Sequence, residues 1–216
     1  DDIAYEAKGS IVDFKMPNTE ILSAISGPLV EFSVNPGALE LTGQFQTEGV
    51  ELNGQFFYNR KKQKSRLAAD FEIDRALMNT LALPVLDKLV QGSSVAKFSL
   101  DLPKDGIPNF EIKSDLIGIK LSFDQLKWQK PASSYGELII TGTIDNGLKF
   151  DNIFLSADGL VLNGRPTIGT EQGLGRLVFD NFKVDQRIDV TGRFGPGQKL
   201  TIRKGYFDAR PYLLGA

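Results

Sequence analysis

The chain has 216 residues, of which 41% are hydrophobic and 24% charged, as is typical of a folded protein with a sizeable core. Its 25 basic and 27 acidic residues give a net charge of −2, and the short basic run Arg60, Lys61, Lys62 and Lys64 indicates a solvated turn more than a nucleic-acid surface. Cys and His are absent, which excludes disulfides, thiolate and imidazole chemistry and most zinc sites, and suits an oxidising compartment.

The first part of the chain, residues 1–73, alternates apolar and polar residues in a way that predicts β-strands. Apolar residues stand at every second position from Ile3 to Ala7, from Val30 to Val34, from Leu39 to Phe45 and from Leu67 to Ile73. Breakers such as Asn35-Pro36-Gly37 fall between these runs and predict the turns that connect the strands.

Residues 74–92 have a different pattern, which predicts one short helix. Apolar residues recur there at every fourth position, at Leu77, Leu81, Val85 and Leu89. Asp74 is placed to cap the first turn and Gly92 stands just past the last one, while Pro84 removes a backbone donor and should kink the helix. Two interpretations stay open: a helix that covers part of the sheet, and a helix that binds a membrane surface or a partner.

Residues 93–216 return to the alternation typical of strands. The clearest runs are Phe98 to Leu102, Phe110 to Ile112, Ile117 to Phe123, Ile188 to Phe194 and Leu200 to Ile202. Turn signals separate the runs at Pro103 to Gly106, Asp145 to Gly147, Asp158-Gly159 and Gly195 to Gly197. We therefore expect a mainly β fold, with one long antiparallel sheet of about a dozen strands over residues 1–216 and a single kinked helix.

A five-residue unit recurs inside the strands: an apolar residue, Thr or Asn, Gly, any residue, and a second apolar residue. Its four copies are Leu41 to Phe45, Leu52 to Phe56, Ile140 to Ile144 and Val190 to Phe194. Because side chains alternate, each glycine opens a notch between two apolar residues on one face, and glycine inside a strand marks a bend or a close approach. A curved, twisted sheet is expected, with the notches either filled by ordinary packing or open as a groove for a ligand.

The candidate lining of such a groove consists of residues that share one face within their own strand. These residues are Leu41, Phe45, Leu52, Phe56, Phe98, Leu100, Ile119, Leu121, Ile140, Ile144, Val190 and Phe194. The same alternation builds a closed, dry core equally well, so both interpretations stay open.

The sequence offers little support for catalysis or metal binding. The glycine-rich segment from Gly169 to Gly175 lacks the Lys-Ser or Lys-Thr of a phosphate-binding loop. Asp180 and Asp185 form a pair of carboxylates of the kind that arises by chance among 27 acidic residues. We expect no enzyme, no metal site and no cofactor.

Three segments of the second half carry a resemblance. They are Leu81 to Pro84 leading to Gly92, Leu126 to Ala132 (LKWQKPA) and Gly205 to Leu213 (GYFDARPYL). Together, over residues 81–213, they resemble the C-terminal region of the AsmA-like family of large envelope proteins. For Trp128 we expect packing under a strand edge or a half-wet position at a rim, and for Arg210 a pairing with Asp208 or a contact with a head group.

The resemblance implies a long periplasmic protein, anchored in the inner membrane, of which this chain is an excised segment. It also implies a curled β-sheet whose concave apolar groove binds the acyl chains of phospholipids and conducts them towards the outer membrane. A continuous apolar surface without fixed polar partners suits an acyl chain, whose burial contributes about 0.8 kcal/mol per CH2 group. The alternative is a structural scaffold or a module that docks other envelope proteins through a sheet edge.

Overall fold

The computed structural model describes residues 4–18, 23–47, 49–75, 77, 90–145, 147–168, 174–195 and 200–210. Most of these residues form β-strands, as the alternating pattern predicts. The described residues also include a 3-10 turn, η1 (Asp124–Leu126). The fold is therefore mainly β.

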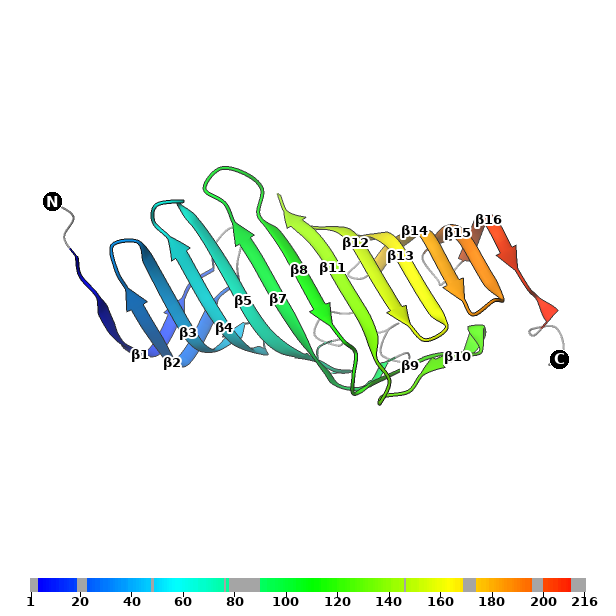
Figure 1. Cartoon of the computed structure of the whole chain (residues 1–216), viewed down its shortest axis with the longest axis horizontal. Helices are drawn as coiled ribbons and strands as arrows, with labels where there is room; N and C mark the ends of the chain where they lie inside the picture. Colours follow the sequence, from blue (N-terminus) through cyan, green and yellow to red (C-terminus); the bar gives the residue numbers. More distant parts are fainter. Residues whose placement is uncertain are drawn as a thin grey trace. The chain divides into compact units, whose positions relative to one another are not determined.

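Thirteen strands in the described part of the chain form one open antiparallel sheet, in which spatial order follows chain order and β1 and β16 are the edges (Figure 1). They are β1 (Ala7–Met16), β2 (Ile25–Val34), β3 (Ala38–Thr47), β4 (Val50–Asn59), β5 (Lys64–Ile73), β7 (Ser94–Leu102), β8 (Asn109–Ser114), β11 (Gly136–Ile144), β12 (Leu148–Ala157), β13 (Leu160–Ile168), β14 (Leu174–Val184), β15 (Ile188–Phe194) and β16 (Leu200–Phe207). Turns such as the one at Asn35, whose Oδ1 accepts hydrogen bonds from the amides of Gly37 and Ala38, connect neighbouring strands as predicted.

Three short strands leave this sheet and form a second one, which the prediction of a single sheet missed. They are β6 (Val90–Gly92), β9 (Ile119–Phe123) and β10 (Trp128–Lys130), in the order β10-β9-β6. The pairing of β6 with β9 in the second sheet requires Gly92 (φ +90°) and Gly118 (φ +96°). A side chain on either glycine would collide with a carbonyl oxygen of the segment that contains the other one. Only glycine tolerates both the left-handed conformation and this approach.

The predicted helix is confirmed at its start and wrong at its end. The amide of Leu77 donates a hydrogen bond to Oδ1 of Asp74 over 2.8 Å, as expected of an N-cap. Residues 76 and 78–89 lie outside the described residues. Val90–Gly92 is strand, paired with Ile119–Leu121, so the helix does not extend to residue 92. Gly92, which the sequence pattern predicts as a helix cap, instead allows the close approach between β6 and β9.

The chain divides into two compact units, which we describe separately. Unit 1 consists of residues 1–72, 95–112 and 142–148, and unit 2 of residues 73–94, 113–141 and 149–216. Strands such as β7 and β8 contribute residues to both units.

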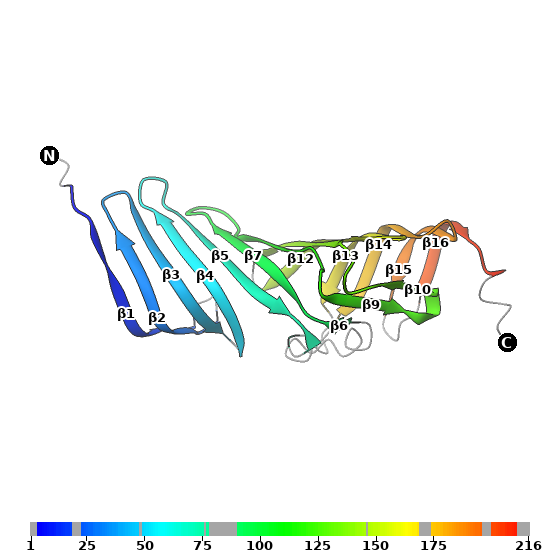
Figure 2. The same ribbon diagram turned by 60° about the horizontal axis from the view of Figure 1, so that its bottom comes forward.

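Unit 2 has two layers with a filled core between them. Figure 2 shows β9 and β10 passing over the C-terminal strands of the large sheet. The indole Nε1 of Trp128 donates a hydrogen bond to the carbonyl oxygen of Asp158 over 2.9 Å, which ties the two layers together. On β14 and β15 of the large sheet, the rings of Phe179, Phe182 and Phe194 contact one another with centroids 5.2 to 5.8 Å apart, and Phe179 and Phe182 are buried.

Candidate functional site: the apolar face of unit 1

The strand register of unit 1 places apolar side chains of successive strands opposite one another on one face. Leu41 pairs with Phe32 on one side and with Phe56 on the other, and Phe56 pairs with Leu67. We call these four residues the bulky row. Cross-strand neighbours of this kind contact each other directly and stabilise the sheet.

A second row lies on β2, β3 and β4, two residues further along each strand towards the β2–β3 and β4–β5 turns. Leu39 pairs with Val34 and with Tyr58. We call these three residues the rim row. Every residue of the bulky row and of the rim row is partly exposed, and among the described residues no second sheet covers them, in contrast to the core of unit 2. The two rows therefore present a continuous apolar surface across four strands.

The glycine notches on this face are filled by neighbouring side chains. A side-chain carbon on Gly54 would lie 3.0 Å from the ring of Phe45, which occupies the notch. Phe45 is 8% exposed and also meets Phe14 edge to face, with ring centroids 6.1 Å apart. In unit 2 the ring of Phe179 fills the notch at Gly192 in the same way. At these positions the packed interpretation of the glycine unit applies, and the open-notch interpretation does not.

Several of the predicted lining residues are core residues. Leu100 is fully buried and Val190 is 1% exposed. Phe98 stacks on Phe110, with centroids 6.5 Å apart. By contrast, Ile140 and Ile144 are not core residues, since both are partly exposed on β11.

Two predicted lining residues lie in a different sheet. Ile119 and Leu121 belong to β9 of the second sheet, where they are 1% and 6% exposed. They do not join the bulky row, because the chain leaves the large sheet at Gly118. The residues brought together on the open face of unit 1 are thus Leu41 and Phe56, with Leu52 beside the buried Phe45.

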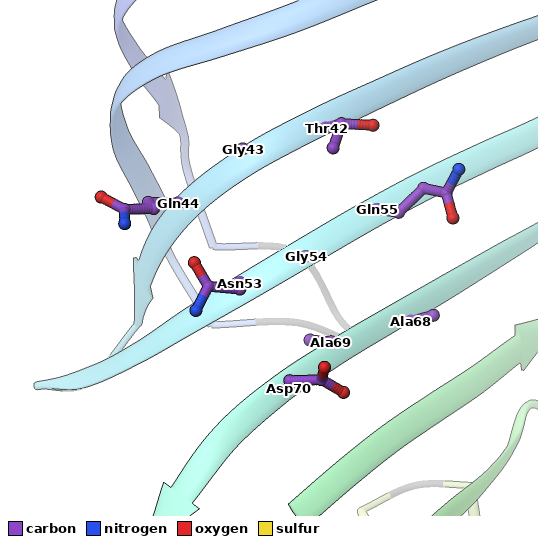
Figure 3. A pocket seen from close by; sticks show the side chains of 9 residues that line it. All are labelled: Thr42, Gly43, Gln44, Asn53, Gly54, Gln55, Ala68, Ala69 and Asp70. Atoms are coloured by element: carbon purple, nitrogen blue, oxygen red, sulfur yellow. The ribbon is translucent and has the colours of Figure 1, made fainter. Parts of the chain in front are cut away.

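The opposite face of unit 1, called the polar face below, carries mostly polar side chains, and Leu29 and Phe57 are exposed on it as well. A shallow hollow of about 500 Å³ lies on it, over a floor of Gly43 and Gly54 (Figure 3). Its other lining residues are Thr42, Gln44, Asn53, Gln55, Ala68, Ala69 and Asp70. The alternation of β3 and β4 turns these polar side chains away from the bulky row, so the hollow is separate from the apolar face.

Sequence reasoning missed a buried lysine in unit 2. Lys130 is 1% exposed, and its Nζ donates hydrogen bonds to the carbonyl oxygens of Leu116 (2.7 Å), Ile119 (2.9 Å) and Pro131 (3.1 Å). Burial lowers the pKa of this ammonium, and the charge of Asp115 opposes that shift. The available signal was the shared face of residues 128 and 130, since Trp128 is buried as well.

The sequence left two positions open for Trp128 and two for Arg210. In both cases the structure shows the contact within the protein. Trp128 is 6% exposed and lies under the strands, not at a wet rim. Arg210 pairs with Asp208 through two hydrogen bonds of 2.9 and 2.7 Å. These hydrogen bonds lower the pKa of Asp208 to about 2.

The acidic pair noted in the sequence is held by arginines. Asp180 lies 3.2 Å from Arg165, and Asp185 lies 2.6 Å from Arg187. Within the described ranges, no group of three or more acidic residues is arranged to hold a metal ion. The described residues also contain no helix with the length and hydrophobicity needed to cross a membrane.

Comparison with models of known protein families, with curated proteins and with solved structures finds no match to this chain.

Proposed function

We propose that the apolar face of unit 1 binds the acyl chains of a phospholipid. The observation that carries this proposal is the contrast between the two units. The apolar core of unit 2 is covered by a second layer, whereas the bulky row and the rim row of unit 1 are partly exposed across four strands. Exposed apolar surface of this continuity is typical of a binding site.

The size and chemistry of this surface fit an acyl chain. The bulky row crosses four neighbouring strands, which are separated by three spacings, so it is about 14 Å long, and the rim row crosses three strands and is about 10 Å long. The side chains that form the rows carry no charge, and an acyl chain needs no polar partner. Each methylene group removed from water contributes about 0.8 kcal/mol, so a chain that follows one row gains several kcal/mol.

The resemblance to the AsmA-like family supports a wider proposal. In it, the chain is a segment of a periplasmic protein anchored in the inner membrane, and the lipid passes along the sheet towards the outer membrane. The chain binds and conducts lipid in this proposal and performs no chemical reaction.

Lipid retention by the 216-residue chain tests the proposal. Native mass spectrometry of protein purified without detergent should show bound phospholipid. Phe56→Gln should reduce the bound fraction several-fold, because it places an amide in the bulky row. Phe57→Gln is the matched control, since Phe57 is the next residue on β4 and is 38% exposed on the polar face. Circular dichroism checks that both variants fold.

Two results would count against the proposal. One is the absence of lipid from the wild-type chain. The other is equal retention by the two variants. In the first case, capture of an envelope protein by the lipid-free chain would favour the scaffold interpretation.

A further inference from the structure

We propose that the turn between β4 and β5 binds the negatively charged head group of a phospholipid whose acyl chains lie on the apolar face of unit 1. The inference rests on the proposed function and adds to it the class of lipid, an anionic phospholipid. It also assigns a role to the one basic run in the sequence.

The turn concentrates positive charge. Arg60, Lys61, Lys62 and Lys64 are four cations within five residues, all of them exposed. Within the part of the chain that the structure describes, none of the four forms an ion pair, whereas other exposed cations such as Lys8 and Lys183 lie within 3.0 Å of a carboxylate. Like charges this close repel one another, and a bound anion relieves the repulsion.

The turn lies at the end of the apolar rows. Tyr58 of the rim row pairs with Ser65, and the next pair, Asn59 with Lys64, closes the hairpin. Arg60 is two residues beyond Tyr58, about 7 Å along the strand. A phosphate bound at the turn therefore lies close to the start of the apolar surface.

Arg60 is held at this rim by contacts from two other segments. Its amide donates a hydrogen bond to the carbonyl oxygen of Gly37 over 2.9 Å, which places the turn beside the one between β2 and β3. Its guanidinium donates through Nη1 to the hydroxyl of Tyr5 over 2.6 Å, so the side chain extends towards the segment before β1. Tyr5 is itself 43% exposed.

This anchoring prepares the guanidinium for a phosphate. A guanidinium has five N–H donors in a planar fork, and the bond to Tyr5 uses one of them. The fork matches the geometry of phosphate oxygens, and a charge-assisted hydrogen bond of this type is about twice as strong as a neutral one. Because the hydrogen bond to Tyr5 restricts the Arg60 side chain, less conformational entropy is lost when the anion binds.

The neighbouring apolar rows select a lipid among anions. A free phosphate or a nucleic acid would use only the charge of the turn. A phospholipid uses the charge and the partly exposed side chains of the rim row and the bulky row together. The shared chemistry is a phosphate group, and the acyl chain distinguishes the proposed ligand from the soluble ones.

A comparison of two fluorescent lipids tests the inference. Phosphatidylglycerol and phosphatidylcholine with the same acyl chains are offered as monomers to the full 216-residue chain, and their dissociation constants are measured. We expect phosphatidylglycerol to bind about tenfold more tightly, the equivalent of ~1.4 kcal/mol. Arg60→Gln/Lys62→Gln should remove this preference, as should high salt. The matched control, Lys97→Gln/Lys204→Gln, removes two exposed cations elsewhere and should keep it.

Each other outcome has a defined meaning. Equal affinity for the two lipids, or an unchanged preference in Arg60→Gln/Lys62→Gln, overturns the inference and leaves the proposed function standing. Failure of both lipids to bind defeats the proposed function itself. Glycerol 3-phosphate binding as tightly as phosphatidylglycerol would show a site for free phosphate. Adsorption to intact anionic vesicles without uptake of lipid monomers would show a bilayer-binding surface. Both of these results overturn the inference.

Discussion

The ammonium of Lys130 lies 2.7 Å from the carbonyl oxygen of Leu116, at the point where the chain passes from the large sheet into the second one. Lys130→Met removes this donor from three carbonyl oxygens in a buried site. Unsatisfied buried groups cost about 1–3 kcal/mol each, although some of these oxygens keep other partners, so we expect a loss of about 2 kcal/mol in the free energy of unfolding. Urea denaturation measures it. Lys97→Met, at an exposed position, should change stability by less than about 0.5 kcal/mol. An equal effect of the two substitutions would show that the hydrogen bonds of Lys130 do not hold the second sheet.

Gly192 is required by the backbone of β16. A side-chain carbon there would collide with the carbonyl oxygen of Thr201 and lie 3.0 Å from the ring of Phe179. Gly192→Ala should therefore destabilise the chain by about 1–3 kcal/mol, the usual range for overpacking. Gly37→Ala is the control, because the nearest atom to its added carbon, Oδ1 of Asn35, is at 3.4 Å. Thermal unfolding followed by circular dichroism compares the two variants, and an unchanged midpoint for Gly192→Ala would contradict the packed interpretation of the glycine unit.

Phe45 is a core residue and not part of the exposed apolar surface. It is 8% exposed and covers Gly54, so Phe45→Ala should cost about 3 kcal/mol or more of stability through the cavity that it leaves. Phe57→Ala, on the polar face, should cost much less. Denaturation curves of the two variants test this difference. Comparable losses would show that Phe45 is not buried in solution.

The pair formed by Asp208 and Arg210 predicts a pH dependence. Hydrogen bonds from Arg210 lower the pKa of Asp208 to about 2. A lowered pKa in the folded state means that the pair stabilises the fold above the ordinary carboxylate range and loses this effect as the pH falls through about 2. Titration of the carboxyl carbon by NMR should give a midpoint of about 2. In Arg210→Ala the midpoint should return to the ordinary value for an aspartate. An ordinary midpoint in the wild-type chain would show that the pair does not form.

Much of the fold follows from local patterns. The alternation from Leu39 to Phe45 predicts a strand with one apolar face, and β3 has that face. Asp74 predicts the N-cap that the structure contains. A strand with one apolar face and a helix N-cap are both determined by residues close together in the sequence, so sequence patterns predict them.

The features that were not predicted depend on distant partners. Ile119 and Leu121 alternate like the residues of the large sheet, yet they pair with Val90–Gly92 in the second one. Gly92 indicates a positive φ angle in either case, as a helix cap or as a strand glycine, and only its approach to Gly118 decides between them. Lys130 is a charged residue of a type usually found at the surface, and its burial depends on the carbonyl groups that accept its hydrogen bonds.

The proposed function requires that lipid contacts the apolar face of unit 1 and not its polar face. Photocrosslinking tests it most directly, with benzoylphenylalanine introduced in place of Phe56 or of Phe57, the adjacent residues of β4 that face opposite sides. After irradiation with phospholipid, mass spectrometry should find a lipid adduct at position 56 and little at position 57. Adducts of equal yield at both positions, or none at position 56 in a folded chain, would contradict the claim.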